Sequence, residues 1–259
     1  MFDQGRGPVV VVIPGLHGRW EWMRPALREL ARACRVISYS LRGDIGSTHV
    51  ADSDLGFEGY TQQLDEVLDR AGVQRATVCG VSFGGFVALR YASTRRARVE
   101  ALVLASAPAP GWQPNPQQAR WLRRPWLSTP AFVATSPFRL WPEVCATHPG
   151  LPGRLRFFAR QGLRAAAAPM MPSLMARRIR EAQRLDFRAD CARVEVPTLV
   201  VSGENGLDRV VPVTNTRTYA SLIRNARYEL LEGTGHIGVL TKPERFATLI
   251  SDFAHAHTH

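Results

Sequence analysis

Short apolar runs alternate along the chain with longer segments in which apolar residues recur every three or four positions. The runs are rich in valine, isoleucine and leucine and fall near residues 8–13, 34–40, 75–81, 98–105, 196–202 and 226–232. Runs that are apolar throughout are typical of strands buried on both faces of a parallel sheet. The periodic segments predict helices near residues 20–33, 57–71, 84–94, 213–224 and 242–255. Such an alternation predicts an α/β fold.

The segment between residues 106 and 195 interrupts this alternation. Prolines and tryptophans crowd its first part, and helical periodicity returns only in Leu155–Ala167 and Leu174–Leu185. We therefore divide the chain into an α/β core, residues 1–107 and 194–259, and a helical insert, residues 108–193.

Length and composition fit one sizeable globular core. The chain has 259 residues, of which 45% are hydrophobic, and no apolar stretch approaches the roughly 20 residues of a membrane-spanning helix. The four cysteines are widely spaced and follow no metal-binding pattern. This usage predicts reduced thiols, a cytoplasmic protein and a site without metal or cofactor.

The positive charge of the chain is concentrated in the insert. Residues 110–195 contain fourteen arginines and five acidic residues, against a net charge of +11 for the whole chain. Such a field steers anionic substrates or holds a protein at anionic lipid, unless it is simply a solvated surface. Because the sequence has no helix-turn-helix, RNA-binding or zinc signature, we expect no nucleic-acid partner.

A serine lies in the pattern G-x-S-x-G, within Gly80-Val81-Ser82-Phe83-Gly84. The motif follows an apolar run and opens a helical pattern, so it predicts a sharp strand-to-helix turn that exposes the serine hydroxyl. Glycines two residues before and after the serine remove the Cβ atoms that would clash in such a turn. The amide groups at the start of the following helix favour a developing negative charge there.

A histidine and two carboxylates follow in the order that a catalytic triad on this kind of turn requires. His236 lies in the glycine-rich loop after the run near 226–232, whereas His255, His257 and His259 belong to an expected disordered tail. The loop after the run near 196–202 carries Glu204 and Asp208.

Together these motifs resemble the α/β-hydrolase family over nearly the whole chain outside the insert. The resemblance implies that Ser82 is the nucleophile and His236 the base. Relatives usually place the acid three residues after the glycine of this loop and four before its proline. The first spacing reaches Gly206, which has no carboxylate, and the second reaches Asp208 from Pro212. We expect Asp208 as the acid, with Glu204 as the alternative.

The resemblance also implies an oxyanion hole at the end of the first core strand. The chain reads Pro14-Gly15-Leu16-His17-Gly18 there, where most relatives have His-Gly. Aligning the strand ends makes the amides of Leu16 and Phe83 the two donors, whereas aligning His-Gly would shift the first donor to Arg19. We expect Leu16 and Phe83, with His17 in the wall of the substrate pocket.

Relatives insert a helical cap where residues 108–193 lie in this chain. Trp112, Trp126 and Trp141 are candidates for the pocket wall, and Arg123, Arg124, Arg177 and Arg178 for a positive entrance. Relatives also begin with two further strands, for which Met1–Pro8 is too short. We therefore expect an α/β-hydrolase fold with a mostly parallel six-stranded sheet that lacks those two strands, and residues 34–40 near one edge.

The function implied by the resemblance is hydrolysis of a carboxylic ester with a short acyl or aryl group, through an acyl-enzyme and without a cofactor. A lactonase or a carbon–carbon bond hydrolase acting on an anionic substrate remains an alternative with the same triad. A non-enzymatic ligand receptor would bind without turnover. The expected partner is a small carbonyl compound, and the sequence is also compatible with a homodimer.

Overall fold

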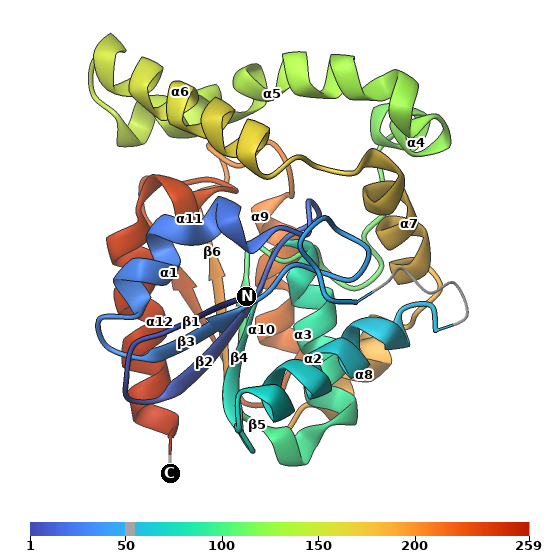
Figure 1. Ribbon diagram of the computed structural model, residues 1–259, viewed down its shortest axis with the longest axis vertical. Coiled ribbons are helices and arrows are strands. Elements are labelled where there is room, and N and C mark those ends of the chain that lie inside the picture. Colours follow the sequence, from blue (N-terminus) through green and yellow to red (C-terminus); the bar gives the residue numbers. More distant parts are fainter. Residues whose placement is uncertain (50–54, 259) are drawn as a thin grey trace.

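The computed structural model describes residues 1–49 and 55–258. Its centre is a seven-stranded sheet of order β1-β3-β2-β4-β5-β6-β7, in which β2 to β7 run parallel (Figure 1). The strands are β1 (Phe2–Gln4), β2 (Val9–Ile13), β3 (Arg35–Ser38), β4 (Ala76–Val81), β5 (Val99–Ala105), β6 (Thr198–Ser202) and β7 (Ala226–Leu230). The predicted α/β fold is confirmed.

The expectation of only six strands is wrong by one edge strand. The first three residues after Met1 form β1, which pairs antiparallel with β3. Phe2 is buried and its ring lies 5.6 Å from that of Trp20. Gly5 and Gly7 have φ values of 90° and 106°, a backbone conformation that favours glycine and lets so short a chain turn back. Three residues carry no readable periodicity, so tertiary packing of Phe2 decides this strand.

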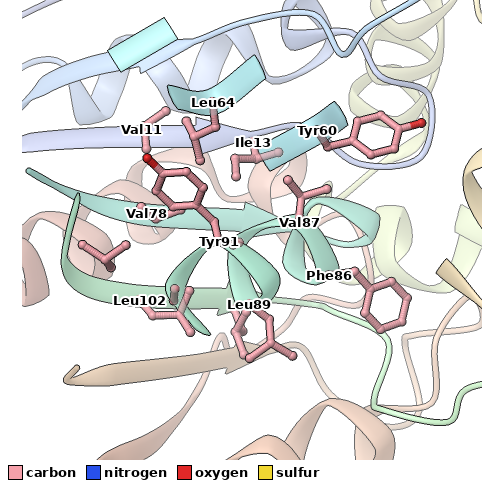
Figure 2. Packing of buried hydrophobic residues seen from close by; sticks show 14 of the residues in the cluster. Val11, Ile13, Tyr60, Leu64, Val78, Phe86, Val87, Leu89, Tyr91 and Leu102 are labelled. Carbon is pink, nitrogen blue, oxygen red and sulfur yellow. The ribbon is translucent and has the colours of Figure 1, made fainter. Parts of the chain in front are cut away.

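Helices cover both faces of the sheet. Alternate residues of a strand point to opposite faces of the sheet. Val10 and Val12 of β2 pack against one group of helices, and Val11 and Ile13 pack against a second group on the other face. The first group is α1 (Arg24–Leu30), α11 (Gly238–Thr241) and α12 (Pro243–His257). The second is α2 (Glu58–Arg70), α3 (Phe83–Thr94), α8 (Phe187–Arg193), α9 (Val213–Arg217) and α10 (Tyr219–Leu222), and Figure 2 shows its apolar packing around α3. Two short 3₁₀ helices are η1 (Trp20–Met23) and η2 (Arg96–Arg98).

Five helices lie between β5 and β6 in the chain, and the first four of them lie across the carboxyl end of the sheet (Figure 1). These four are α4 (Pro116–Arg123), α5 (Pro125–Thr147), α6 (Leu151–Ala167) and α7 (Pro172–Ala182). The predicted helices 155–167 and 174–185 correspond to α6 and α7. Helix α5 could not be read from the sequence, because Pro130, Pro137 and Pro142 lie inside it.

The C-terminal helix extends further than expected. Helix α12 continues to His257, and the rings of His257 and Phe253 pack 4.6 Å apart. A disordered tail is therefore wrong for His255 and His257, while His259 lies outside the described residues. In the described ranges, none of the helices is long and apolar enough to cross a membrane.

Candidate active site

Ser82 lies in the sharp turn between β4 and α3. Its φ of 52° and ψ of −121° place a non-glycine residue in a conformation that costs about 1–3 kcal/mol. The turn is held because the Ser82 N–H donates to the Ala105 carbonyl at 2.8 Å. A Cβ atom on Gly80 would collide with the backbone of Gly84, and one on Gly84 with that of Ile13. The glycines of the motif are therefore required by close backbone packing.

His236 connects Ser82 to Asp208. The distance from His236 Nε2 to Ser82 Oγ is 3.1 Å, and that from His236 Nδ1 to Asp208 Oδ2 is 3.2 Å. Ser82 follows β4, Asp208 follows β6 and His236 follows β7, so three parallel strands deliver the three side chains to one edge of the sheet. An imidazole placed in this way can accept the serine proton through Nε2 while Nδ1–H faces a carboxylate.

The other oxygen of Asp208 is fixed by its own loop. Oδ1 accepts hydrogen bonds from the N–H groups of Val210 and Val211 at 2.8 and 2.9 Å. Burial of Asp208 disfavours its ionised form, but His236 and these two amides outweigh that effect and lower the pKa of the carboxyl. Asp208 is therefore held as a carboxylate beside the imidazole.

Glu204 has a different role. Its Oε1 accepts a hydrogen bond from the Gly233 N–H, in the loop that carries His236. The N–H groups of Leu207 and Asp208 both donate to the Glu204 carbonyl, so residues 204–208 form one helical turn. This turn places Asp208, rather than Glu204, next to the imidazole of His236.

A third carboxylate, from the insert, reaches the loop of His236. Glu143 lies on α5 with 1% of its surface exposed, and its oxygens accept hydrogen bonds from the Ile237 N–H at 2.9 Å and from Thr241 Oγ1 at 2.7 Å. The burial of His236 disfavours the imidazolium ion, but Asp208 and Glu143 together raise the pKa of His236. Sequence reasoning missed Glu143, although it is the only acidic residue between positions 110 and 180.

The loop after β2 lies against Ser82. A Cβ atom on Gly15 would approach Ser82 Cβ to 3.4 Å, so the backbone that leads to Leu16 passes directly beside the serine. Within the described part of the chain, the Leu16 and Phe83 amides donate no hydrogen bond to another protein group. The Arg19 amide, in contrast, donates to His17 Nδ1 at 3.4 Å. Leu16 and Phe83 thus have free N–H groups beside Ser82.

Helix α7 of the insert fixes this loop through Arg178. The guanidinium donates to the Leu16 carbonyl at 2.9 Å, to the Arg42 carbonyl at 3.4 Å and to Asp44 Oδ2. Arg178 and Asp44 are 1% and 4% exposed, so the pair is buried. Of the four candidate arginines, Arg178 is therefore not part of a positive entrance, because its charge is paired with Asp44 beneath the loop.

The four expected pocket residues are scattered. His17 stacks on Trp22 with ring centroids 4.9 Å apart, and burial, with help from Arg178, lowers its pKa to about 3. His17 is therefore neutral. Trp126 and Trp141 are 60% and 43% exposed on α5, and Trp112 borders a cavity.

That cavity has a volume of about 470 Å³ and is lined in part by Asp208. Its wall includes Trp112, Arg209 and five carboxamide residues. The carboxamides come from the β5–α4 and β6–α9 connections and from the starts of α4 and α9: Gln113, Asn115, Gln118, Asn205 and Asn215. Neither Ser82 nor His236 is part of the wall. Residues 1–49 and 55–258 contain no cluster of His, Cys, Asp and Glu that could hold a metal ion.

The fold is that of a known protein family. The family profile of the α/β hydrolase fold matches residues 8–243. The putative carbamate hydrolase RutD of Pseudomonas savastanoi pv. phaseolicola is 30% identical over 257 residues, covering 97% of this chain and 95% of that protein. The 3-oxoadipate enol-lactonase 1 of Acinetobacter baylyi is 24% identical, covering 92% and 84%.

Among solved structures, the thermophilic esterase from Thermogutta terrifontis, with malate bound, superposes with a TM-score of 0.76. It is 25% identical, and the match covers 99% of this chain and 93% of the esterase. The profile match spans the elements that carry Ser82, Asp208 and His236. This chain is a hydrolase that belongs to the α/β-hydrolase fold family.

Proposed function

We propose that this protein is a serine hydrolase that cleaves carboxylic esters through Ser82, His236 and Asp208. The observation that carries the proposal is the continuous hydrogen-bonded chain from Ser82 Oγ through His236 to Asp208, with separations of 3.1 and 3.2 Å. In this proposal helices α4 to α7 of the insert form a cap over the catalytic edge of the sheet, whereas α8, the last helix of residues 108–193, packs with α3 on the core.

In the proposed mechanism, Ser82 Oγ attacks the carbonyl carbon while His236 Nε2 takes its proton. The carboxylate of Asp208 keeps Nδ1–H in place and stabilises the imidazolium ion. The amides of Leu16 and Phe83 donate to the oxyanion, and loss of one such donor elsewhere costs about 3–4 kcal/mol of transition-state stabilisation. His236 then protonates the leaving group, and water attacks the acyl-enzyme to release the acid and restore Ser82.

Lactones and carbamates are the competing substrate classes. The relatives that bear the names enol-lactonase and carbamate hydrolase favour them, and both carry a carbonyl that the same acyl transfer would open. A carbon–carbon bond hydrolase for a carboxylate-bearing dienone has lost part of its support, because Arg178 is paired with Asp44 and unavailable to a substrate.

A substrate panel tests the proposal. The values of kcat/KM for p-nitrophenyl acetate, an aryl ester, a five-membered lactone, an N-alkyl carbamate and a dienone carboxylate would be compared between the wild-type protein and Ser82→Ala. We expect the short esters to be preferred and Ser82→Ala to lose about 10⁴–10⁶-fold in kcat. A fluorophosphonate should label the wild type and leave the variant unlabelled. Turnover by Ser82→Ala above a tenth of wild type would refute Ser82 as the nucleophile.

A further inference from the structure

The long insert helix α5 turns its apolar side to solvent. Every residue classed as exposed between positions 126 and 141 is apolar, and together they form what we call the α5 apolar face: Trp126, Leu127, Pro130, Ala131, Val133, Ala134, Pro137, Phe138 and Trp141. Leu127 and Phe138 are each 75% exposed. A surface helix normally shows the opposite arrangement, with its apolar stripe against the core.

The less exposed side of α5 is mixed: Phe132 and Leu140 lie there together with Ser128, Thr129, Thr135, Ser136 and Arg139. The hydroxyls of Thr129, Thr135 and Ser136 donate to carbonyl oxygens one turn earlier in the helix, at 2.7 Å each. Arg139 donates to Thr135 and Ser136 and lies over the ring of Phe132. These four polar side chains are thus hydrogen-bonded within α5 itself, and in residues 1–49 and 55–258 no segment covers the α5 apolar face.

The apolar surface continues onto α6. Leu151, Leu155 and Leu163 are 58%, 60% and 73% exposed. Trp141 of α5 stacks on Phe158 of α6 with ring centroids 6.2 Å apart, which joins the two helices. Exposed apolar surface that extends over two helices marks an interaction site rather than ordinary surface variation.

Positive charge surrounds this surface. Helices α4 to α6 and their connections, residues 116–167, contain eight arginines and a single acidic residue, the buried Glu143. Arg123 and Arg124 are exposed immediately before α5. At the other end of the face, the Arg154 guanidinium lies 5.7 Å from the Trp141 ring centre.

The apolar face together with the nearby arginines indicates which kind of partner can bind here. A second copy of the chain would bring the same arginines against each other, so its docking is opposed by like charges. Anionic headgroups attract each nearby basic residue while the acyl region accepts the apolar side chains, and tryptophan favours the boundary between the two. We propose that the α5 apolar face docks on a bilayer containing anionic lipid, with α5 lying in the plane of the interface.

The proposal does not depend on the reaction at Ser82, and it is tested with the full-length protein and vesicles. Binding would be measured by co-sedimentation with phosphatidylglycerol/phosphatidylcholine vesicles and with phosphatidylcholine alone, and by the tryptophan emission maximum. The apolar variant is Trp126→Ser/Leu127→Ser/Phe138→Ser, and its matched control is Leu55→Ser/Leu230→Ser, which changes exposed apolar residues elsewhere. The charge variant is Arg123→Glu/Arg124→Glu, with Arg28→Glu/Arg245→Glu as its control.

We expect the wild type to bind the anionic vesicles with a blue shift in emission and to bind phosphatidylcholine weakly. The apolar variant and the charge variant should each lose about tenfold or more in partitioning to the anionic vesicles, whereas both controls should bind as the wild type does. Since the substituted side chains are exposed, thermal melting should remain unchanged. Equal binding to both vesicle types, or an apolar variant that binds like the wild type, would overturn the proposal. So would a dimer in sedimentation equilibrium that the apolar variant dissociates, because the face would then bind a second copy.

Discussion

The carboxylate of Glu143, on the insert helix α5, accepts a hydrogen bond from the backbone N–H of Ile237, the residue directly after His236. Both Glu143 and the His236 imidazole are largely shielded from water, so the negative charge is weakly screened and favours the protonated imidazole. Helix α5 thereby contributes to the pKa of a residue that belongs to the core. The insert is coupled electrostatically to the site that it covers.

Glu143→Gln should shift the acid limb of the pH profile. The proposed mechanism needs neutral His236, so kcat/KM falls as the pH drops through the pKa of this residue. Glu143 raises that pKa, and removing its charge should lower it. The acid limb of kcat/KM for a neutral ester should therefore move to lower pH, with the plateau value little changed.

Glu181→Gln is the matched control, because Glu181 is also a buried carboxylate of the insert but hydrogen-bonds to Tyr60 and Arg177 instead. Its acid limb should coincide with that of the wild type. An unshifted limb in Glu143→Gln would show that Glu143 is itself uncharged where His236 titrates, a state that the burial of Glu143 favours by raising its pKa.

The two carboxylates of the β6 loop should differ sharply in their effect on turnover. Asp208→Asn should lower kcat by about 10⁴-fold, because an amide favours the wrong imidazole tautomer. Glu204→Gln should be mild, since Glu204 touches the Gly233 amide and not the imidazole. Steady-state kinetics on one ester would compare them. The reverse order would mean that the loop rearranges and that Glu204 becomes the acid in solution.

The parallel strands and the turn at Ser82 could be predicted because each depends on local sequence. A strand buried on both faces must be apolar along its length, and a tight strand-to-helix turn requires glycine at Gly80 and Gly84. Edge strand β1 has neither signal, since only the burial of Phe2 in the folded chain selects it.

The contributions of the insert to the site could not be predicted for a related reason. Glu143 meets Ile237 across 94 positions of sequence, and Arg178 meets Leu16 across 162. No local pattern encodes such pairings. The exposed apolar face of α5 could not be predicted either, because the three prolines inside this helix argue against any helix there.

The buried pair of Arg178 and Asp44 should dominate the stability of the contact between α7 and the loop after β3, which carries Asp44. Arg178→Met leaves Asp44 buried without its cation, which should lower the free energy of unfolding by about 3–5 kcal/mol. Burial already raises the pKa of Asp44, and losing Arg178 should raise it further. When the folded-state pKa of Asp44 lies above its unfolded value, stability is lost as the pH rises through that folded-state pKa. The difference in unfolding free energy between wild type and Arg178→Met should therefore be smaller at acidic pH.

Urea denaturation at neutral and acidic pH would measure this deficit. The double variant Arg178→Met/Asp44→Leu should recover part of the lost stability, because it removes both buried charges. The double variant would be compared with the single variants Arg178→Met and Asp44→Leu. If its loss of unfolding free energy equals the sum of the two single losses, the ion pair does not couple these residues. The hydrogen bond from Arg178 to the Leu16 carbonyl would then carry the contact.

The arginines of the insert should make the capture of anionic substrates sensitive to salt. Helices α4 to α6, which lie across the carboxyl end of the sheet (Figure 1), carry positive charge on exposed residues such as Arg123, Arg156 and Arg160. Such a field is screened over about 10 Å at 0.1 M salt. Stopped-flow measurement of kcat/KM should therefore show a fall with added salt for an ester bearing a carboxylate, and almost none for a neutral ester of equal acyl length.

The variant Arg123→Glu/Arg124→Glu should reduce the difference in salt dependence between the two esters, whereas the control Arg28→Glu/Arg245→Glu should leave that difference unchanged. Identical salt responses of the two esters in the wild type would restrict the role of these arginines to the outer surface, where the vesicle experiment examines them.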